Sequence, residues 1–185
     1  MHTVAVFVGS LRKESFNRKL ALALAELGKD KLHFTIVPLD DVPMYNQDLE
    51  GDLPEPVARI KKAVAEADGM LLVTPEYNRS IPPVLKNALD WCSRPMGKSV
   101  LSGKPVAIAG TSPGMVGTAV AQSHLRSVLT MLAMVVMGQP EVYIVWNPGY
   151  FDAENRVADE KNRAFLTLFL DKFNAWIGMH GSKAS

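Results

Sequence analysis

The chain has 185 residues, with 20 lysine and arginine residues against 19 aspartate and glutamate residues. This near-neutral balance gives no basic surface for nucleic acid or an anionic membrane, so we expect neither partner. The length suits one domain and no apolar run is long enough to span a membrane, so residues 1–185 are expected to form a single cytoplasmic domain. One cysteine allows no internal disulfide, and the four histidines show no metal-ligand spacing with it, so no metal site is predicted.

Short apolar segments alternate with amphipathic segments along the chain. The expected strands are 3–8, 33–37, 69–74, 105–109 and 141–146, and the expected helices are 15–28, 55–67, 82–92, 114–131 and 155–177. This order requires a parallel sheet with helices on both faces, and right-handed crossovers then favour a doubly wound α/β fold. Five strands indicate the flavodoxin-like order 2-1-3-4-5, whose ligand crevice lies at the carboxyl ends of strands 1 and 3.

The first expected strand, 3–8, leads into a loop that suits an anion. Backbone N–H groups at the start of the following helix are unpaired and carry partial positive charge. Ser10, Ser15 and Asn17 add side-chain donors, and Arg12 adds a charged planar fork. A simpler interpretation has Ser15 only capping the helix and Arg12 as a solvated surface charge.

Polar residues also follow the third expected strand, as a crevice at the strand ends predicts. The segment 74–80, Thr-Pro-Glu-Tyr-Asn-Arg-Ser, leads through Ile81-Pro82-Pro83 into a helix. The prolines make this loop short and preset. Its backbone amides and Asn78 suit the edge of a flat heterocycle, although an ordinary βα turn has the same composition.

The fourth expected strand ends in a glycine-containing loop, 110–117, where the backbone can approach a ligand closely. Its spacing is not the dinucleotide fingerprint, which follows the first strand of such folds. Because all three loops follow neighbouring parallel strands, we expect them to form one site. The long connection 38–53, which contains Tyr45, is typical of a binding or interface loop.

The segment 9–20 resembles the Gly-Ser-x-Arg-x-x-Ser-x-Asn-x-x-Leu signature of the NADPH-dependent FMN reductase family. Segments 74–91 and 112–117 resemble its second signature and third loop. The similarity spans essentially the whole chain and is greatest to the soluble bacterial quinone and chromate reductases. It implies a flavodoxin-like fold, non-covalent FMN, NAD(P)H as co-substrate, and a homodimer or dimer of dimers.

The resemblance also implies roles for individual residues. Those matching the phosphate-binding positions are Ser10, Arg12, Ser15, Phe16 and Asn17. Those matching the positions along the isoalloxazine are Pro75, Glu76, Tyr77 and Asn78, with Ser112 and Gly114 beside the ring. Tyr45, Tyr77 and Arg79 are expected at the substrate slot, although either tyrosine equally suits packing between subunits. Pro113 departs from the glycine or other small residue common in relatives, which leaves the ring contacts there open.

The expected activity is an FMN-dependent NAD(P)H oxidoreductase with no catalytic side chain, because the flavin carries the chemistry. The electrons pass on to quinones, or to chromate, azo compounds or free flavin, in a ping-pong cycle. No Gly-x-Ser-x-Gly elbow surrounds Ser10, which disfavours hydrolysis. The alternative is a flavodoxin-type electron carrier without NAD(P)H turnover, but such carriers tend to be strongly acidic. A response-regulator domain needs acids after strand 1, whereas Asp40 and Asp41 follow strand 2. The preference between NADH and NADPH is left open.

The helix 114–131 carries apolar residues on more than one face, which predicts an interface. In the family that the chain resembles, the helices after strands 3 and 4 pair around a two-fold axis. We therefore expect a homodimer in which the partner, through its Tyr45 loop, closes part of the slot. The alternative is that Leu125, Val128, Leu129 and Leu132 all face their own sheet.

Overall fold

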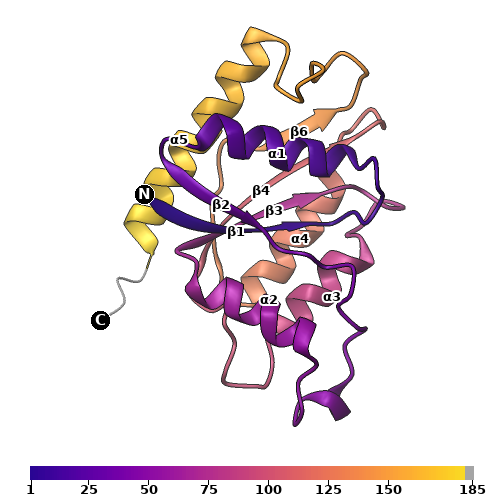
Figure 1. Ribbon diagram of the computed structural model, residues 1–185, viewed down its shortest axis with the longest axis vertical. Coiled ribbons are helices and arrows are strands. Elements are labelled where there is room, and N and C mark those ends of the chain that lie inside the picture. The colour runs from indigo at the N-terminus through magenta and orange to yellow at the C-terminus, as the bar shows by residue number, and fades with distance from the viewer. Residues whose placement is uncertain (182–185) are drawn as a thin grey trace.

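The computed structural model describes residues 1–181 and contains one parallel sheet covered by helices on both faces (Figure 1). The strands are β1 (His2–Val8), β2 (Leu32–Ile36), β3 (Gly69–Thr74), β4 (Pro105–Ser112), β5 (Val135–Val136) and β6 (Val142–Val145). The helices are α1 (Phe16–Gly28), α2 (Glu55–Glu66), α3 (Pro83–Cys92), α4 (Ala119–Met131) and α5 (Glu160–His180), with a 3₁₀ turn η1 (Gln47–Leu49) in the long connection. The sheet order β2-β1-β3-β4-β5 confirms the predicted flavodoxin-like topology.

Two short strands share the fifth position of the sheet. β5 pairs with Pro105 and Val106 of β4, and β6 pairs with the carboxyl end of the same strand, 109–112. Gly138 and Pro140 lie between them, and proline has no N–H for the ladder. The prediction of one strand over 141–146 therefore found β6 and missed β5, which is too short to show an apolar pattern.

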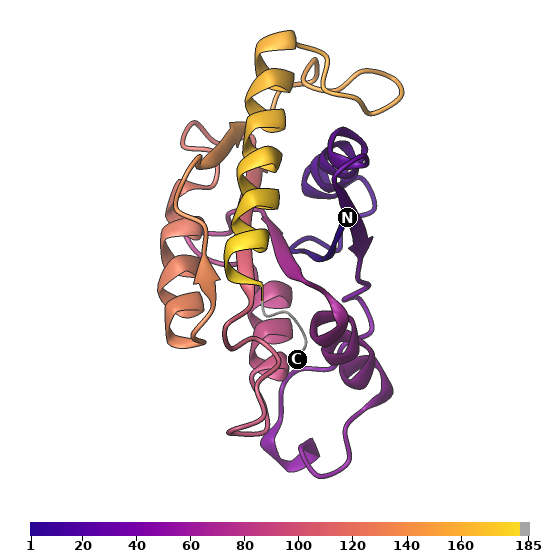
Figure 2. The same ribbon diagram turned by 90° about the vertical axis from the view of Figure 1, so that its left-hand side faces the viewer.

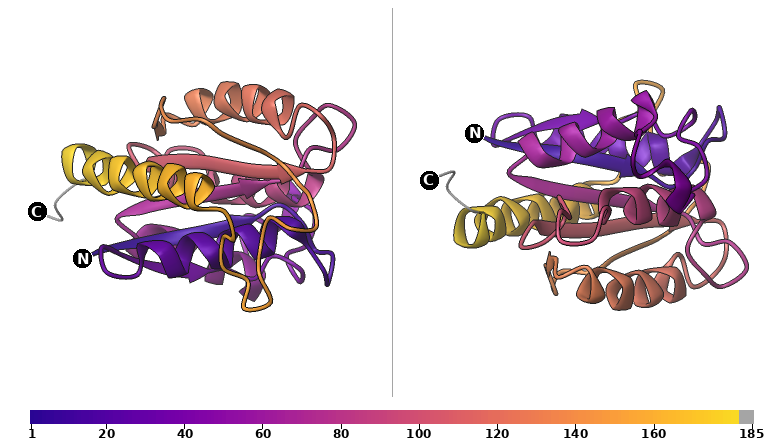
Figure 3. Two further views of the ribbon diagram at one scale, coloured as in Figure 1. Left: turned by 90° about the horizontal axis from the view of Figure 1, so that it is seen from above. Right: turned by 90° about the horizontal axis from the view of Figure 1, so that it is seen from below.

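Alternate strand residues face two separate cores. Val4, Val6 and Val8 of β1 pack with α1 and α5, whereas Ala5 and Phe7 pack with α2, α3 and α4. Figure 3 shows α1 and α5 side by side over one face, and α2 and α3 over the other. Burial on both faces explains why the strands are continuous apolar segments. No helix within residues 1–181 has both the length and the apolar character needed to cross a membrane.

Two helices begin later than the sequence predicts. α4 begins at Ala119 instead of residue 114, because the preceding loop makes a turn in which Gly117 has a φ of +57° and donates to the Gly114 carbonyl at 2.9 Å. α5 begins at Glu160 instead of residue 155. There Asn155 has a φ of +60°, and the Asp159 carboxylate caps the helix by accepting from the Asn162 N–H at 2.9 Å.

The strands run so that their carboxyl ends all lie at one edge of the sheet. This edge is on the right in Figure 1 and on the far side in Figure 2, where α5 and the start of β1 face the viewer. The loops after β1, β3 and β4 therefore meet, as the topology requires.

Candidate functional site

The three predicted loops enclose a cavity of about 280 Å³ at this edge. Its lining residues are Ser10, Arg12, Ser15, Phe16, Asn17, Pro75, Glu76, Tyr77, Thr111, Ser112 and Pro113. All five residues predicted from the first loop are among them. Asn78, Arg79 and Gly114 lie beside the lining residues in sequence without lining the cavity themselves, and Thr111 is a wall residue that the sequence patterns did not indicate.

The first loop places the start of α1 at the cavity. Ser15 is 2% exposed, and its Oγ accepts from the Arg18 N–H at 3.2 Å, so it caps the helix as the simpler interpretation held. The N–H groups of Phe16 and Asn17 come first in the helix and have no intrahelical acceptor. These donors and the positive end of the helix dipole both favour an anion here.

Arg12 adds a positive charge that the protein does not neutralise. Its guanidinium carbon lies 5.0 Å from the centroid of the Phe16 ring, and Phe16 in turn stacks on Trp146 with centroids 4.0 Å apart. Within residues 1–181 no carboxylate oxygen lies within 4 Å of the Arg12 guanidinium. The side chain is thus oriented by aromatic stacking and leaves its charge for a ligand.

Asn17 joins the first loop to the third. Its Nδ2 donates to the Thr111 carbonyl at 2.9 Å, and its Oδ1 accepts from the Thr111 N–H at 3.0 Å. The side chain is only 3% exposed, so both bonds are buried. One hydrogen of the Asn17 amide remains available to a ligand. The main role of Asn17 is to set the distance between two walls of the cavity through its two bonds to Thr111.

The Glu76 carboxylate is engaged with the start of α4. Its Oε2 accepts from the N–H groups of Val120 and Ala121 at 3.1 and 3.0 Å, and its Oε1 lies 3.3 Å from Nη1 of Arg79. Thr118 precedes the helix and makes no capping bond with its side chain. Glu76 therefore caps α4 from a distant loop and fixes the second wall of the cavity against the helix that follows the third.

A tight turn ends the second loop. Tyr77 and Ser80 exchange backbone hydrogen bonds at 3.1 and 3.0 Å, and both central residues have positive φ, 50° at Asn78 and 64° at Arg79. This is the arrangement of a type I′ turn, which asparagine tolerates and arginine adopts under strain. The turn leaves Tyr77 45% exposed beside the cavity.

Two glycines allow the loops to lie this close. A Cβ on Gly9 would lie 2.7 Å from Cγ of Pro82, and one on Gly110 would lie 2.3 Å from the Thr74 carbonyl oxygen. Gly110 thus brings the third loop close to Thr74 and Thr118, and the approach of loop 110–117 to a ligand stays a prediction.

Comparisons with known proteins decide the class of this site. A sequence model of the family described as NADPH-dependent FMN reductase matches residues 2–146. The chain belongs to this family. The resemblance of the three loops is thereby confirmed over most of the chain.

Individual relatives agree with the family assignment. A 2-hydroxy-1,4-benzoquinone reductase from a Burkholderia species is 52% identical over 174 residues, which cover 94% of this chain and 95% of that protein. A quinone reductase from Pseudomonas putida is 45% identical over 181 residues, 97% of each protein. FerB, a flavoenzyme NAD(P)H:(acceptor) oxidoreductase from Paracoccus denitrificans, superposes with a TM-score of 0.95 at 46% identity, covering 98% of this chain and all of FerB. These relatives favour an NAD(P)H-dependent enzyme over a flavodoxin-type carrier.

This member of the family presents groups that fit a phosphorylated flavin. Arg12 and the first N–H groups of α1 suit a phosphate, and Ser10 adds a hydroxyl donor. Thr111 lines the cavity, and its Oγ1 is buried without a hydrogen-bond partner within residues 1–181. FMN is therefore the cofactor that both the family and the residues support, with NAD(P)H as co-substrate.

Tyr45 lies outside this cavity, against α3. Its backbone N–H donates to Oδ1 of Asn87 at 2.7 Å, and its ring meets Trp91 edge-on with centroids 5.0 Å apart. Its phenol donates to Oε1 of Glu50 at 2.6 Å, and this bond raises the pKa of Tyr45. Tyr45 thus packs within its own chain. Its place in a substrate slot, such as that of a neighbouring subunit, stays a prediction.

The apolar residues of α4 mostly face their own sheet. Leu125 and Leu129 are buried, and Val128 and Leu132 pack against the same core while half-buried. Met131 alone among the apolar residues 125–132 is largely exposed, at 85%. The alternative, in which these residues face their own sheet, therefore describes α4 better than an interface does. The apolar pattern of α4 then gives little support to the predicted dimer.

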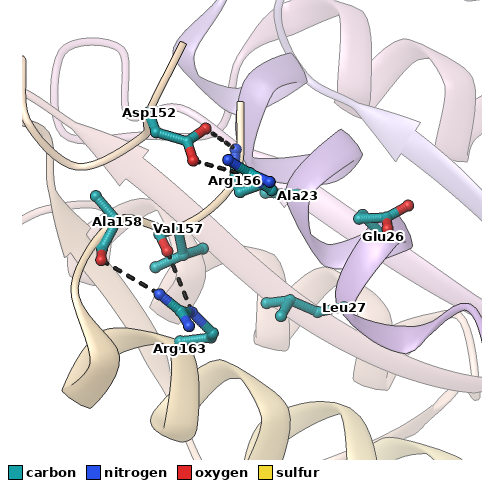
Figure 4. A pocket seen from close by; sticks show the side chains of 8 residues that line it. All are labelled: Ala23, Glu26, Leu27, Asp152, Arg156, Val157, Ala158 and Arg163. Atoms are coloured by element: carbon teal, nitrogen blue, oxygen red, sulfur yellow. Dashed lines mark hydrogen bonds and ion pairs between the residues drawn. The ribbon is translucent and has the colours of Figure 1, made fainter. Parts of the chain in front are cut away.

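A larger cavity, of about 610 Å³, lies between α1, α5 and the segment 152–158 (Figure 4). Its charged groups all have partners: Asp152 pairs with Arg156 at 2.8 Å, Glu26 with Lys29 at 2.6 Å, and Arg163 with Glu160 at 2.9 Å. We assign no ligand to it. The single cysteine, Cys92, is no redox group either, because burial raises its pKa to about 12.

Proposed function

We propose that this FMN reductase reduces quinones with NAD(P)H, in the reaction NAD(P)H + H⁺ + quinone → NAD(P)⁺ + hydroquinone. The observation that carries the proposal is the cavity at the strand ends, with the uncompensated Arg12 charge on one side and the second-loop turn on the other. Two relatives at 52% and 45% identity are named as quinone reductases, which supports this acceptor class. The redox chemistry comes from FMN when it is bound: the flavin takes a hydride from NAD(P)H and passes the electrons to the quinone.

The residues of the chain bind and orient in this proposal. Arg12 and the N–H groups of Phe16 and Asn17 hold the phosphate, while the second and third loops enclose the ring. Tyr77 is exposed beside the cavity and offers a flat apolar surface to an aromatic acceptor. Glu76 is the carboxylate that lines the cavity, and its Oε2 already accepts hydrogen bonds from two N–H groups of α4. We therefore assign no side chain as a dedicated acid or base.

Both substrates are proposed to use the same face of the flavin in turn. Initial rates measured anaerobically at several concentrations of NADPH and menadione should then give parallel lines in double-reciprocal plots. Protein loaded with FMN that oxidises NADPH no faster with menadione than without it would contradict the proposal and favour an electron carrier. Chromate, offered in place of menadione, tests the second acceptor class.

We also propose a homodimer, or a dimer of such dimers, on the family resemblance. Several apolar side chains are largely exposed: Met115 is 94% exposed, Met131 at the end of α4 85%, Met96 84% and Met44 72%. Exposed apolar side chains of this kind suit an interface, and they lie in the third loop, in the long connection, after α3 and at the end of α4.

A further inference from the structure

A further cavity, of about 500 Å³, opens between the carboxyl ends of β1 and β2. We call it the basic groove, because Arg12, Lys13 and Arg18 line it together with an apolar wall that includes Val8, Ile36 and Leu39. Ser10 and Arg12 line both this groove and the flavin cavity. The two cavities are therefore neighbours on either side of the first loop.

The cations of the basic groove are not neutralised by the protein. Within residues 1–181 no carboxylate oxygen lies within 4 Å of the charged groups of Arg12, Lys13 or Arg18, and all three side chains are exposed. In contrast, Arg59 pairs with Asp41 at 2.6 Å, and many other cations of the chain are paired in the same way.

The acidic residues near the groove leave it positive. Asp41 is engaged by Arg59, and Glu14 pairs with Lys19 at 3.3 Å. Asp40 lines the groove and is the one acidic residue that does so. Three cations thus face one carboxylate in a chain whose total charge is only +1. Such a local excess attracts a multiply charged anion such as a phosphomonoester.

We propose that the basic groove binds the adenosine end of NADPH, with Lys13 and Arg18 on its 2′-phosphate. This inference rests on the proposed function, because it takes NADPH as the reductant of the neighbouring flavin cavity. Arg12 is assigned to the FMN phosphate, so Lys13 and Arg18 are the cations that remain for the 2′-phosphate of NADPH. The apolar wall suits the adenine ring. The enzyme should therefore prefer NADPH to NADH, and Asp40 should oppose that preference by repelling the phosphate.

The test is the double variant Lys13→Gln/Arg18→Gln, assayed as the FMN-loaded protein. We expect the KM for NADPH to rise about tenfold or more, while the KM for NADH, kcat and the Kd for FMN each change less than about twofold. Asp40→Asn should act in the opposite direction and lower the KM for NADPH. The matched control is Lys161→Gln/Lys172→Gln, which removes two exposed cations of α5 that likewise have no carboxylate partner within residues 1–181.

Calorimetric titration with 2′,5′-ADP gives a readout that does not depend on turnover. Binding should weaken about tenfold or more in Lys13→Gln/Arg18→Gln and stay unchanged in the control. An equal rise in KM for NADPH and NADH would overturn the inference, and so would a loss of FMN affinity in the double variant, because the groove would then serve the flavin phosphate. If the wild-type protein oxidises neither NADPH nor NADH, the proposed function fails. The titration with 2′,5′-ADP then decides by itself whether the basic groove binds an adenosine 2′-phosphate.

Discussion

Replacing Arg12 by alanine should weaken FMN binding about ten- to a hundredfold and leave riboflavin binding nearly unchanged. In the proposed site the guanidinium makes a charge-assisted contact with the FMN phosphate, and riboflavin has no phosphate. Within residues 1–181 no carboxylate pairs with this charge, so the substitution breaks no ion pair there. Titrating each flavin into the apoprotein and following the quenching of flavin fluorescence measures both affinities.

Arg94 offers a matched control. It also stacks on an aromatic ring, 5.7 Å from the centroid of Tyr45, and like Arg12 it has no carboxylate within 4 Å among residues 1–181. It lies outside the flavin cavity, so Arg94→Ala should change neither affinity. If Arg12→Ala reduced FMN and riboflavin binding equally, Arg12 would act on the ring or on the fold, and its assignment to the phosphate would be wrong.

Replacing Asn17 by alanine should lower the free energy of unfolding by about 2–4 kcal/mol and weaken FMN binding roughly tenfold. The substitution leaves the buried N–H and carbonyl of Thr111 without their partners, and it releases the third loop from the first. Urea unfolding of the apoprotein measures the loss of stability, and flavin titration at low urea measures the loss of affinity.

Asn87 separates a positioning role from general destabilisation. It also bridges two backbone groups, accepting from the Tyr45 N–H at 2.7 Å and donating to the Pro43 carbonyl at 2.9 Å, but it lies on α3 outside the flavin cavity. Asn87→Ala should therefore destabilise the apoprotein and spare FMN affinity. Asn17→Ala with wild-type affinity for FMN would show that the bridge to Thr111 does not shape the site.

The sheet order and the site edge were predictable because they depend on local patterns. Apolar segments such as 3–8 and 69–74 indicate strands, and the order of strands and helices then places the first and second loops at one edge. Ser10, Arg12 and Ser15 followed from the chemistry of a helix start. The first helical N–H groups are unpaired in any sequence, so a hydroxyl cap and an arginine beside them indicate an anion site.

The remaining features depend on contacts between distant residues. Asn17 and Thr111 are 94 positions apart, and no local pattern shows that their groups bond. The same holds for Glu76: it lines the cavity as predicted, but its capping of α4, 44 positions away, has no local pattern. The packing of the long connection onto α3, through Asn87 and Trp91, likewise joins residues far apart in the sequence, and the place of Tyr45 in the substrate slot stays a prediction.

The helix starts were missed for a different reason. Apolar spacing continues into segments whose backbone turns, as at Gly117 and Asn155, both of which have positive φ. Spacing alone cannot register a change of backbone conformation, so the expected helices 114–131 and 155–177 began too early.

We propose that the cavity at the strand ends holds one FMN by its single phosphate. To test this directly, the purified, flavin-saturated protein is denatured, and the released flavin is identified and counted by chromatography. We expect FMN, in a ratio of about one per chain, and a yellow protein before denaturation. Release of FAD, or a colourless protein that takes up no added FMN, would contradict the account.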